Sequence, residues 1–111
     1  MTYAEIKNII AAIAAALKCE FAYSCFKTGK RSRFLIFYYE NSDDVYADGE
    51  NYKGIENLVI EFYSPTKEID NENTIQTMLK ASGLSYSKTS AYINSEALHI
   101  TTYNLEVMIN G

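Results

Sequence analysis

The segment Arg33–Glu40 constrains the fold more than any other stretch, because it is apolar on both faces from Phe34 to Tyr39. Successive side chains of a strand point to opposite faces of the sheet, so a strand with one solvated face alternates apolar and polar residues. This segment does not alternate. We therefore expect a strand that is covered on both sides, by a helix on one side and with a neighbouring subunit as a candidate cover for the other.

The N-terminal segment predicts a helix that uses its apolar stripe as that cover. Thr2 and Glu5 have the spacing of a capping box, in which each side chain satisfies a backbone N–H of the other residue. Apolar residues follow at helical spacing, namely Ile6, Ile9, Ile10, Ile13 and Leu17. The remaining faces are mostly alanine, which favours either a helix of high intrinsic propensity or a face against which a second body packs closely.

A second helix is predicted from about Asp70 to Ser82. Asp70 or Asn71 can cap it, and Glu72 suits the positive end of its dipole. Ile75, Met78 and Leu79 form its apolar stripe, and Gly83 fits the left-handed position that ends a helix.

The rest of the chain predicts strands over residues 20–27, 33–40, 55–63, 84–93 and 98–109. Thr28-Gly29-Lys30 is expected to turn the first strand back on the second as a hairpin. The order is then α-β-β-β-α-β-β, an α+β fold with a mostly antiparallel sheet and two helices packed on one face. The 111 residues fit one domain over residues 1–111.

Charge and hydrophobicity exclude two classes of function. The net charge is −4, whereas a dedicated reader of nucleic acid is usually basic, so no sequence-specific nucleic-acid binding is expected. The basic residues Lys27, Lys30, Arg31 and Arg33 are interpreted as a solvated turn. The longest apolar run, Ile9–Leu17, is about half of what a bilayer crossing needs, and no signal peptide is recognised. We expect a cytoplasmic protein without membrane partners.

No catalytic, cofactor or metal site is expected. His99 is a lone strand histidine, and the spacing of Cys19 and Cys25 is not that of metal ligands. The acidic segment 41–53 imitates the start of a calcium-binding loop, but Tyr46 and Ile55 stand where oxygen ligands are required. The glycines are scattered and form no phosphate-binding loop.

Tyrosine is the unusual component, with ten residues in the chain. Tyrosine is enriched at protein interfaces, although strand propensity alone explains most of these positions. The acidic segment supplies the candidate residues for contact with a partner or with the lumen of a ring: Asp43, Asp44, Tyr46, Asp48, Glu50 and Tyr52. The candidate subunit interface combines the alanine face of the first helix with the two-sided strand: Ala11, Ala12, Ala15, Tyr38 and Tyr39.

The chain resembles the tail-completion, tail-terminator type neck proteins of long-tailed bacteriophages and prophages. The resemblance covers nearly the whole length and is carried by patterns of residue type and spacing. These patterns are Phe37–Asp44, Tyr46–Asp48 with Tyr52, Ile60–Tyr63, Lys67–Asp70, Gly83–Tyr86 and Ala91–Glu96.

The resemblance implies a structural role. Such proteins form rings, commonly of six subunits, at the head-proximal end of the tail, where they stop growth of the tube and meet the head connector. The implied partners are further copies of the chain, a tail-tube protein and a head connector or stopper protein. The acidic residues 43, 44, 48 and 50 would then contribute negative potential near a path for DNA. The implied place is the host cytoplasm during assembly and then the neck of the virion.

Three alternatives remain open at this stage besides the terminator. The chain could be a neighbouring connector or adaptor of the same neck, since both kinds of protein are small ring-forming α/β proteins. It could also be a small non-enzymatic module that binds a protein partner as a monomer or dimer. A small enzyme with a site shared between subunits is the third and least favoured alternative.

Overall fold

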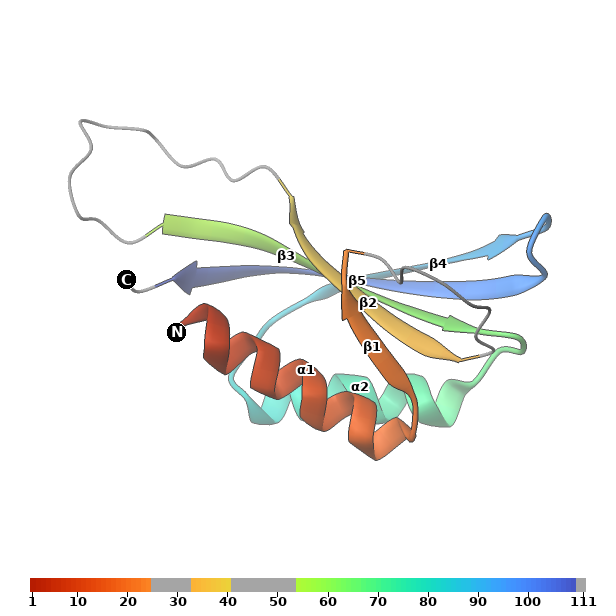
Figure 1. Ribbon diagram of the computed structural model, residues 1–111, viewed down its shortest axis with the longest axis horizontal. Helices are drawn as coiled ribbons and strands as arrows, with labels where there is room; N and C mark the ends of the chain where they lie inside the picture. Colours follow the sequence, from red (N-terminus) through yellow and green to blue (C-terminus); the bar gives the residue numbers. More distant parts are fainter. Residues whose placement is uncertain (25–32, 41–53, 110–111) are drawn as a thin grey trace.

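The computed structural model describes residues 1–24, 33–40 and 54–109. The elements are α1 (Tyr3–Leu17), β1 (Glu20–Tyr23), β2 (Phe34–Glu40), β3 (Gly54–Ser64), α2 (Ile69–Ala81), β4 (Ser87–Ile93) and β5 (Leu98–Ile109). This order confirms the predicted α-β-β-β-α-β-β arrangement, and both helices lie on one face of the sheet (Figure 1).

The five strands form one sheet in the order β1-β2-β3-β5-β4. Three of the four strand pairs are antiparallel, and the longest pairing joins β3 to β5 at the centre of the sheet. The remaining pair, β1 with β2, is parallel. The sheet is therefore mostly antiparallel, as predicted.

The hairpin predicted between the first two strands is wrong, because β1 and β2 run in the same direction. β1 ends at Tyr23, and Ser24 has φ of 71°, a left-handed conformation that interrupts an extended strand. The Ser24 N–H donates to the Phe37 carbonyl over 2.8 Å, which fixes the exit from the strand. The predicted turn at Thr28-Gly29-Lys30 lies outside the described residues.

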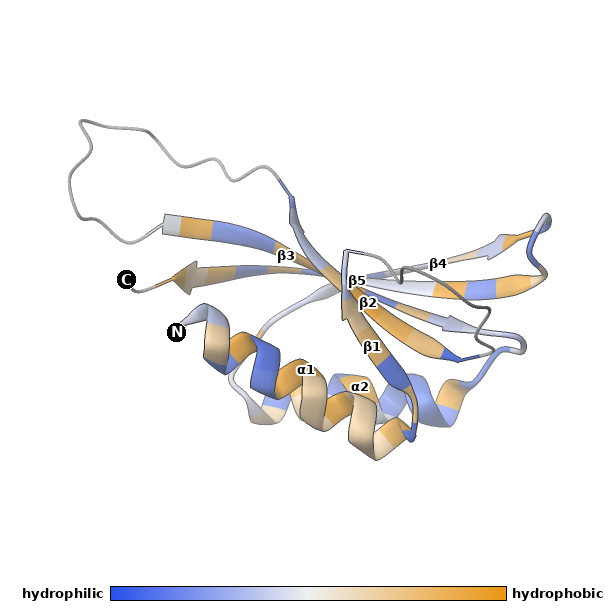
Figure 2. Cartoon of the chain, viewed as in Figure 1, coloured by the Kyte–Doolittle hydropathy of each residue, from blue (hydrophilic) through white to orange (hydrophobic). Residues whose placement is uncertain are grey.

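The core lies between the two helices and the face of the sheet that they cover. Strand alternation puts Leu35 and Phe37 of β2 on this face, paired with Phe62 and Ile60 of β3. The buried residues of α1 are Ile6, Ile10, Ile13, Ala14 and Leu17. Figure 2 shows apolar residues along most of α1, whereas hydrophilic residues follow Ile69 in the first turns of α2.

The capping box of α1 is confirmed. The Glu5 N–H donates to Thr2 Oγ1 over 3.1 Å, and the Thr2 N–H donates to Glu5 Oε1 over 2.7 Å. The hydrogen bonds with Thr2 hold the pKa of Glu5 below its usual value. The helix ends at Leu17, after which Lys18 adopts a left-handed conformation with φ of 56°.

The second helix differs from its prediction at both ends. It starts at Ile69, and its N-cap is Glu68, which makes no side-chain capping bond; neither Asp70 nor Asn71 caps it. Gly83, with φ of +77°, takes the predicted left-handed position after the helix. The Leu84 N–H donates back to the Leu79 carbonyl over 3.0 Å, so Leu84 still belongs to the helix end. For this reason β4 begins at Ser87 and not at Leu84.

The other face of the sheet is partly covered by the chain itself. Phe34 stacks on Tyr63 with ring centroids 4.5 Å apart, and Ile36 is buried on the same face. Tyr38 and Tyr63 both donate to the Glu61 carboxylate, over 3.0 and 2.8 Å. Burial and then Glu61 raise the pKa of Tyr38 to about 12. The second face of β2 is thus covered in part without a neighbouring molecule.

Candidate functional site

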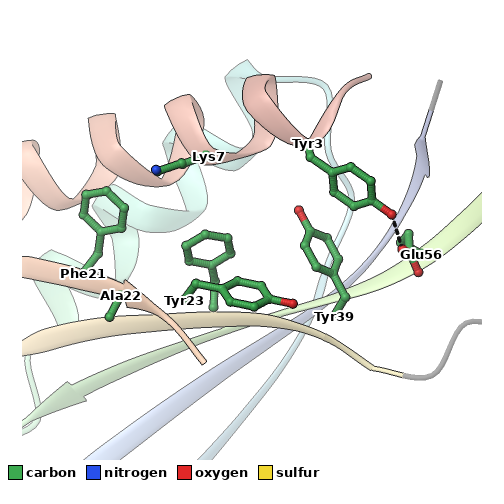
Figure 3. Close-up of a pocket in the computed structure, with 8 residues that line it drawn as sticks. Tyr3, Lys7, Phe21, Ala22, Tyr23, Tyr39 and Glu56 are labelled. Atoms are coloured by element: carbon green, nitrogen blue, oxygen red, sulfur yellow. Dashed lines mark hydrogen bonds between the residues drawn. The ribbon is translucent and has the colours of Figure 1, made fainter. Parts of the chain in front are cut away.

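A recess lies between the N-terminal half of α1 and the β1 edge of the sheet. It has a volume of about 680 Å³, and we call it the aromatic hollow. Its walls are Tyr3, Lys7, Phe21, Ala22, Tyr23, Phe37, Tyr39 and Glu56. Figure 3 shows the aromatic rings from α1, β1 and β2 turned toward one another around it.

Local structure explains why these rings meet. The capping box fixes the start of α1, so Tyr3 is the first helical residue. The parallel register pairs Phe21 with Leu35 and Tyr23 with Phe37, and it thereby puts the rings of β1 on the helix-covered face. Tyr39 follows Phe37 on the same face, since the side-chain period of a strand is two.

The rings contact edge to face. The centroids of Tyr3 and Tyr39 are 5.2 Å apart with an interplanar angle of 81°, and those of Tyr23 and Phe37 are 5.3 Å apart at 73°. Edge-to-face pairs are a favoured arrangement of aromatic side chains. Yet Tyr23 remains 57% exposed, and Tyr3 is exposed as well. These rings are fixed in position while part of their apolar surface still faces solvent.

The polar groups of the hollow lie at its rim. Tyr3 donates its hydroxyl proton to the Glu56 carboxylate, and Lys7 contributes a cation from the next turn of α1. Burial raises the pKa of Tyr39 to about 12, with smaller contributions from Tyr23 and Glu56. The Tyr39 phenol is therefore protonated at neutral pH and available as a hydrogen-bond donor.

This chemistry suits binding of a protein side chain. The described lining offers aromatic faces, one carboxylate and one ammonium group, and no histidine, cysteine or serine occurs among these described lining residues. Aromatic residues around a recess with a polar rim are typical of protein interfaces.

A second polar cluster lies under the opposite end of the sheet. Glu72 of α2 is only 2% exposed, and its carboxylate accepts from two lysines. Lys88 Nζ of β4 lies 2.8 Å from Glu72 Oε1, and Lys67 Nζ lies 3.0 Å from Glu72 Oε2. The Tyr103 hydroxyl donates to the Glu72 carbonyl over 3.3 Å, so this cluster joins α2 to β4 and β5.

The two lysines keep the buried carboxylate ionised. Burial alone raises the pKa of Glu72, but the hydrogen bonds from Lys88 and Lys67 outweigh it, and the net pKa lies below the ordinary value. Glu68 is held in a similar way, because Arg33 donates to it through two nitrogens over 2.7 and 2.6 Å. Arg33 was expected in a solvated turn, and it is instead half-buried in this ion pair.

The structure separates the residues predicted as a subunit interface. Ala12 and Ala15 are exposed on α1, and Ala11 is half-buried. Tyr39 lines the aromatic hollow, whereas Tyr38 lies on the opposite face of the sheet, so these two tyrosines do not share a surface. The six candidates of the acidic segment, Asp43 to Tyr52, lie outside the described residues.

Sequence reasoning missed the residues that surround the hollow. Tyr3, Phe21, Tyr23 and Glu56 come from α1, β1 and β3, and no spacing rule connects them. One signal was readable: the alternation in Phe21-Ala22-Tyr23 predicts two rings on one face.

Cys19 and His99, the other side chains considered for chemistry, both lie within the described residues. Burial raises the pKa of the Cys19 thiol to about 11, which keeps it protonated. His99 packs edge to face on Tyr92 with ring centroids 4.9 Å apart. No group of three metal-ligating side chains occurs among residues 1–24, 33–40 and 54–109. Within the same ranges, neither helix combines the length and hydrophobicity required to cross a bilayer.

Comparison with solved structures is informative about the fold, whereas comparison with sequences is not. No protein-family model matches the sequence, and no curated protein sequence matches it either. A chain in a solved structure described as "Virion of native gene transfer agent (GTA) particle" matches with a TM-score of 0.69 and 10% sequence identity. The match covers 96% of this chain and 92% of that one, so the two chains share their fold over nearly their whole lengths.

Proposed function

We propose that this protein is a structural subunit of a phage-like particle. In this role it forms a ring at the head-proximal end of the tail, terminates the tail tube and joins it to the head connector. The observation that carries the proposal is the fold shared with a chain of a gene transfer agent virion, which extends over nearly all of both chains. The sequence resemblance to tail-completion proteins points in the same direction.

The surface chemistry supports an assembly role over a catalytic one. The aromatic hollow presents fixed, partly exposed rings that a protein partner can cover. The titratable clusters around Glu72 and Glu68 are ion-paired within the chain. We therefore propose a protein without enzymatic activity or cofactor, located in the host cytoplasm during assembly and then in the particle.

Co-assembly with the tail-tube protein encoded beside it tests this function. The purified protein is added to growing tubes, which are followed by light scattering and negative-stain electron microscopy. We expect rings on tube ends and tubes that stop growing. Tubes of unchanged length with bare ends would remove the terminator role, and binding to the connector protein would then distinguish an adaptor from a module outside the particle.

A matched pair of variants connects the hollow to this activity. Tyr23→Ser removes an exposed ring from the aromatic hollow, whereas Ile69→Ser removes a side chain of similar exposure from the start of α2. We expect Tyr23→Ser to reduce the capped fraction of tubes and Ile69→Ser to leave it unchanged. If both variants change the capped fraction equally, the aromatic hollow has no specific role in assembly.

A further inference from the structure

β4 is an edge strand that is exposed on both faces. All its residues from Ser87 to Tyr92 are exposed, and only Ile93 is half-buried. Among the described residues, β4 pairs with β5 alone and forms the end of the sheet. Figure 1 shows that the end of the sheet where β4 meets the start of β5 extends beyond the two helices.

This edge lacks the features that usually prevent an edge strand from pairing with another molecule. Such features are proline, a bulge, or a charge that a second strand would have to bury. β4 has no proline, and its seven residues pair with β5 without interruption. Its single charge, on Lys88, is neutralised by Glu72 beneath the sheet. The side chains Ser87, Thr89, Ser90 and Ala91 are small, so a further strand can approach closely.

The strand directions identify what fits this edge. β1 runs parallel to β2, and the three following pairs, β2 with β3, β3 with β5 and β5 with β4, are antiparallel. β1 and β4 thus form opposite edges of the sheet and run in opposite directions. When a second copy stands beside the first in the same orientation, its β1 lies antiparallel to β4 of the first.

The side chains on the two edges also match. Tyr92 of β4 is 49% exposed and lies on the helix-covered face, opposite His99 in the register. Phe21 and Tyr23 of β1 lie on the same face at the other edge, and Tyr23 is the most exposed ring of the aromatic hollow. Joining the edges brings these rings together, and cross-strand aromatic pairs stabilise antiparallel strands.

We propose that β4 of one copy pairs antiparallel with β1 of the next, so that one sheet continues from subunit to subunit. Tyr92 then lies against the aromatic hollow of the neighbour. The contact joins two different surfaces of the chain, and contacts of this type close into rings when the rotation between copies allows it. The inference rests on the proposed function for its biological setting and deepens it by naming the two edges that meet.

Cysteine cross-linking tests the pairing directly. Cys19 and Cys25 are first replaced by alanine. Ala22→Cys protein is then mixed with Thr89→Cys or Ala91→Cys protein under mild oxidation, alone at high concentration and with tail-tube protein. Ala22, Thr89 and Ala91 share the face turned away from the helices, so either mixture is expected to give covalent dimers. Ser90→Cys is the matched control, because its side chain lies on the other face.

The outcomes separate this inference from the proposed function. The pairing is supported, whether or not tubes are capped, when Ala22→Cys protein forms dimers with Thr89→Cys or Ala91→Cys protein but not with Ser90→Cys protein. Capped tubes without these dimers would overturn the edge pairing and leave the terminator role intact. Dimers of equal yield in all three mixtures, or in none under either condition, would also overturn it.

A charge introduced at the edge provides an independent readout. The double variant Thr89→Lys, Ala91→Lys keeps the β4–β5 register and adds two charges that a neighbouring strand would have to accommodate. We expect mass to shift from multimers to monomer in analytical ultracentrifugation. The double variant Asn73→Lys, Thr77→Lys, at two exposed positions of α2, adds the same two charges and controls for the change in net charge. An unchanged multimer fraction in the double variant would contradict the proposal.

Discussion

The two helices cover the same face of one sheet by different chemistry. α1 contributes only apolar side chains to the core, with Ile10 and Ile13 fully buried. α2 contributes Ile75 and Leu79 together with the buried carboxylate of Glu72, which depends on Lys67 and Lys88 to remain ionised. Removing buried side-chain volume from α1 should therefore lower the free energy of unfolding, and in α2 removing the buried charge should do so.

The largest effect is expected at the apolar helix. Ile10→Ala removes a fully buried side chain and leaves a cavity, which should lower the free energy of unfolding by about 2–5 kcal/mol. Urea denaturation followed by circular dichroism measures this change. Ile9→Ala, at a half-buried position on the same helix, should cost clearly less. Equal costs at the two positions would show that α1 is not held by burial of this stripe.

The next effect is expected at the charged helix. Glu72→Gln keeps the shape of the side chain but leaves two lysines without their carboxylate, at a cost of about 1–3 kcal/mol. Lys67 and Lys88 remain partly exposed and can turn to water, which limits the loss. Asp70→Asn changes an exposed acid in the same turn and should have little effect in the same denaturation experiment. Similar losses for both variants would mean that the general charge of the helix start matters, and not the buried cluster.

A smaller effect tests the start of α1. Thr2→Ala removes one half of the capping box and should lower the free energy of unfolding by about 1 kcal/mol. The start of α2 has no side-chain cap bond to lose. Thr2→Ser keeps the hydroxyl and should recover most of the stability. If it recovers none, the threonine methyl group and not the cap is responsible.

The smallest effect concerns how the loss of unfolding free energy in a variant of each helix changes as the pH is lowered. The folded state lowers the pKa of Glu72 below its unfolded value of 4.5, so the contribution of this carboxylate is complete above that pH. It is lost as the pH falls through the lower, folded pKa. The stability gap between wild type and Glu72→Gln should therefore narrow in urea denaturations between about pH 7 and about pH 3. The difference in unfolding free energy between wild type and Ile10→Ala should stay nearly constant over this pH range. If it narrows as much as the difference for Glu72→Gln, the pH dependence does not come from the buried carboxylate of α2.

The order of elements was predictable because each leaves a local pattern in the chain. The capping box at Thr2 and Glu5, the apolar stripe of α1 and the alternation in β3 depend on near neighbours only. The parallel pairing of β1 was not predictable, since no local pattern in the sequence distinguishes it from a hairpin. Ser24, directly after β1, adopts a left-handed conformation that is rare for a residue other than glycine.

The candidate site was harder to predict, because its residues are brought together by the tertiary fold and not by a local pattern in the sequence. The aromatic hollow joins Tyr3, Tyr23, Tyr39 and Glu56, which meet only when the sheet and α1 are assembled. The buried cluster around Glu72 was also not predictable from local patterns, because Lys88 contacts Glu72 from another element. In addition, a glutamate in the first turn of a helix is ordinarily a surface residue. The predicted subunit interface grouped Tyr38 with Tyr39, although adjacent residues of a strand point to opposite faces, and the structure places these two tyrosines on opposite faces of the sheet.

The pairing of β3 with β5 has a consequence for how the chain acquires its structure. Ser64 pairs with His99 and Gly54 with Ile109, so the partners at the two ends of this ladder are separated by 35 and 55 positions in the sequence. Strands that pair across such distances close large loops and form slowly. During synthesis, β3 is complete well before β5 leaves the ribosome, and it waits with one hydrogen-bonding edge open. Chaperone demand and misassembly during translation should therefore concentrate in this interval, before β5 pairs with the central strand β3.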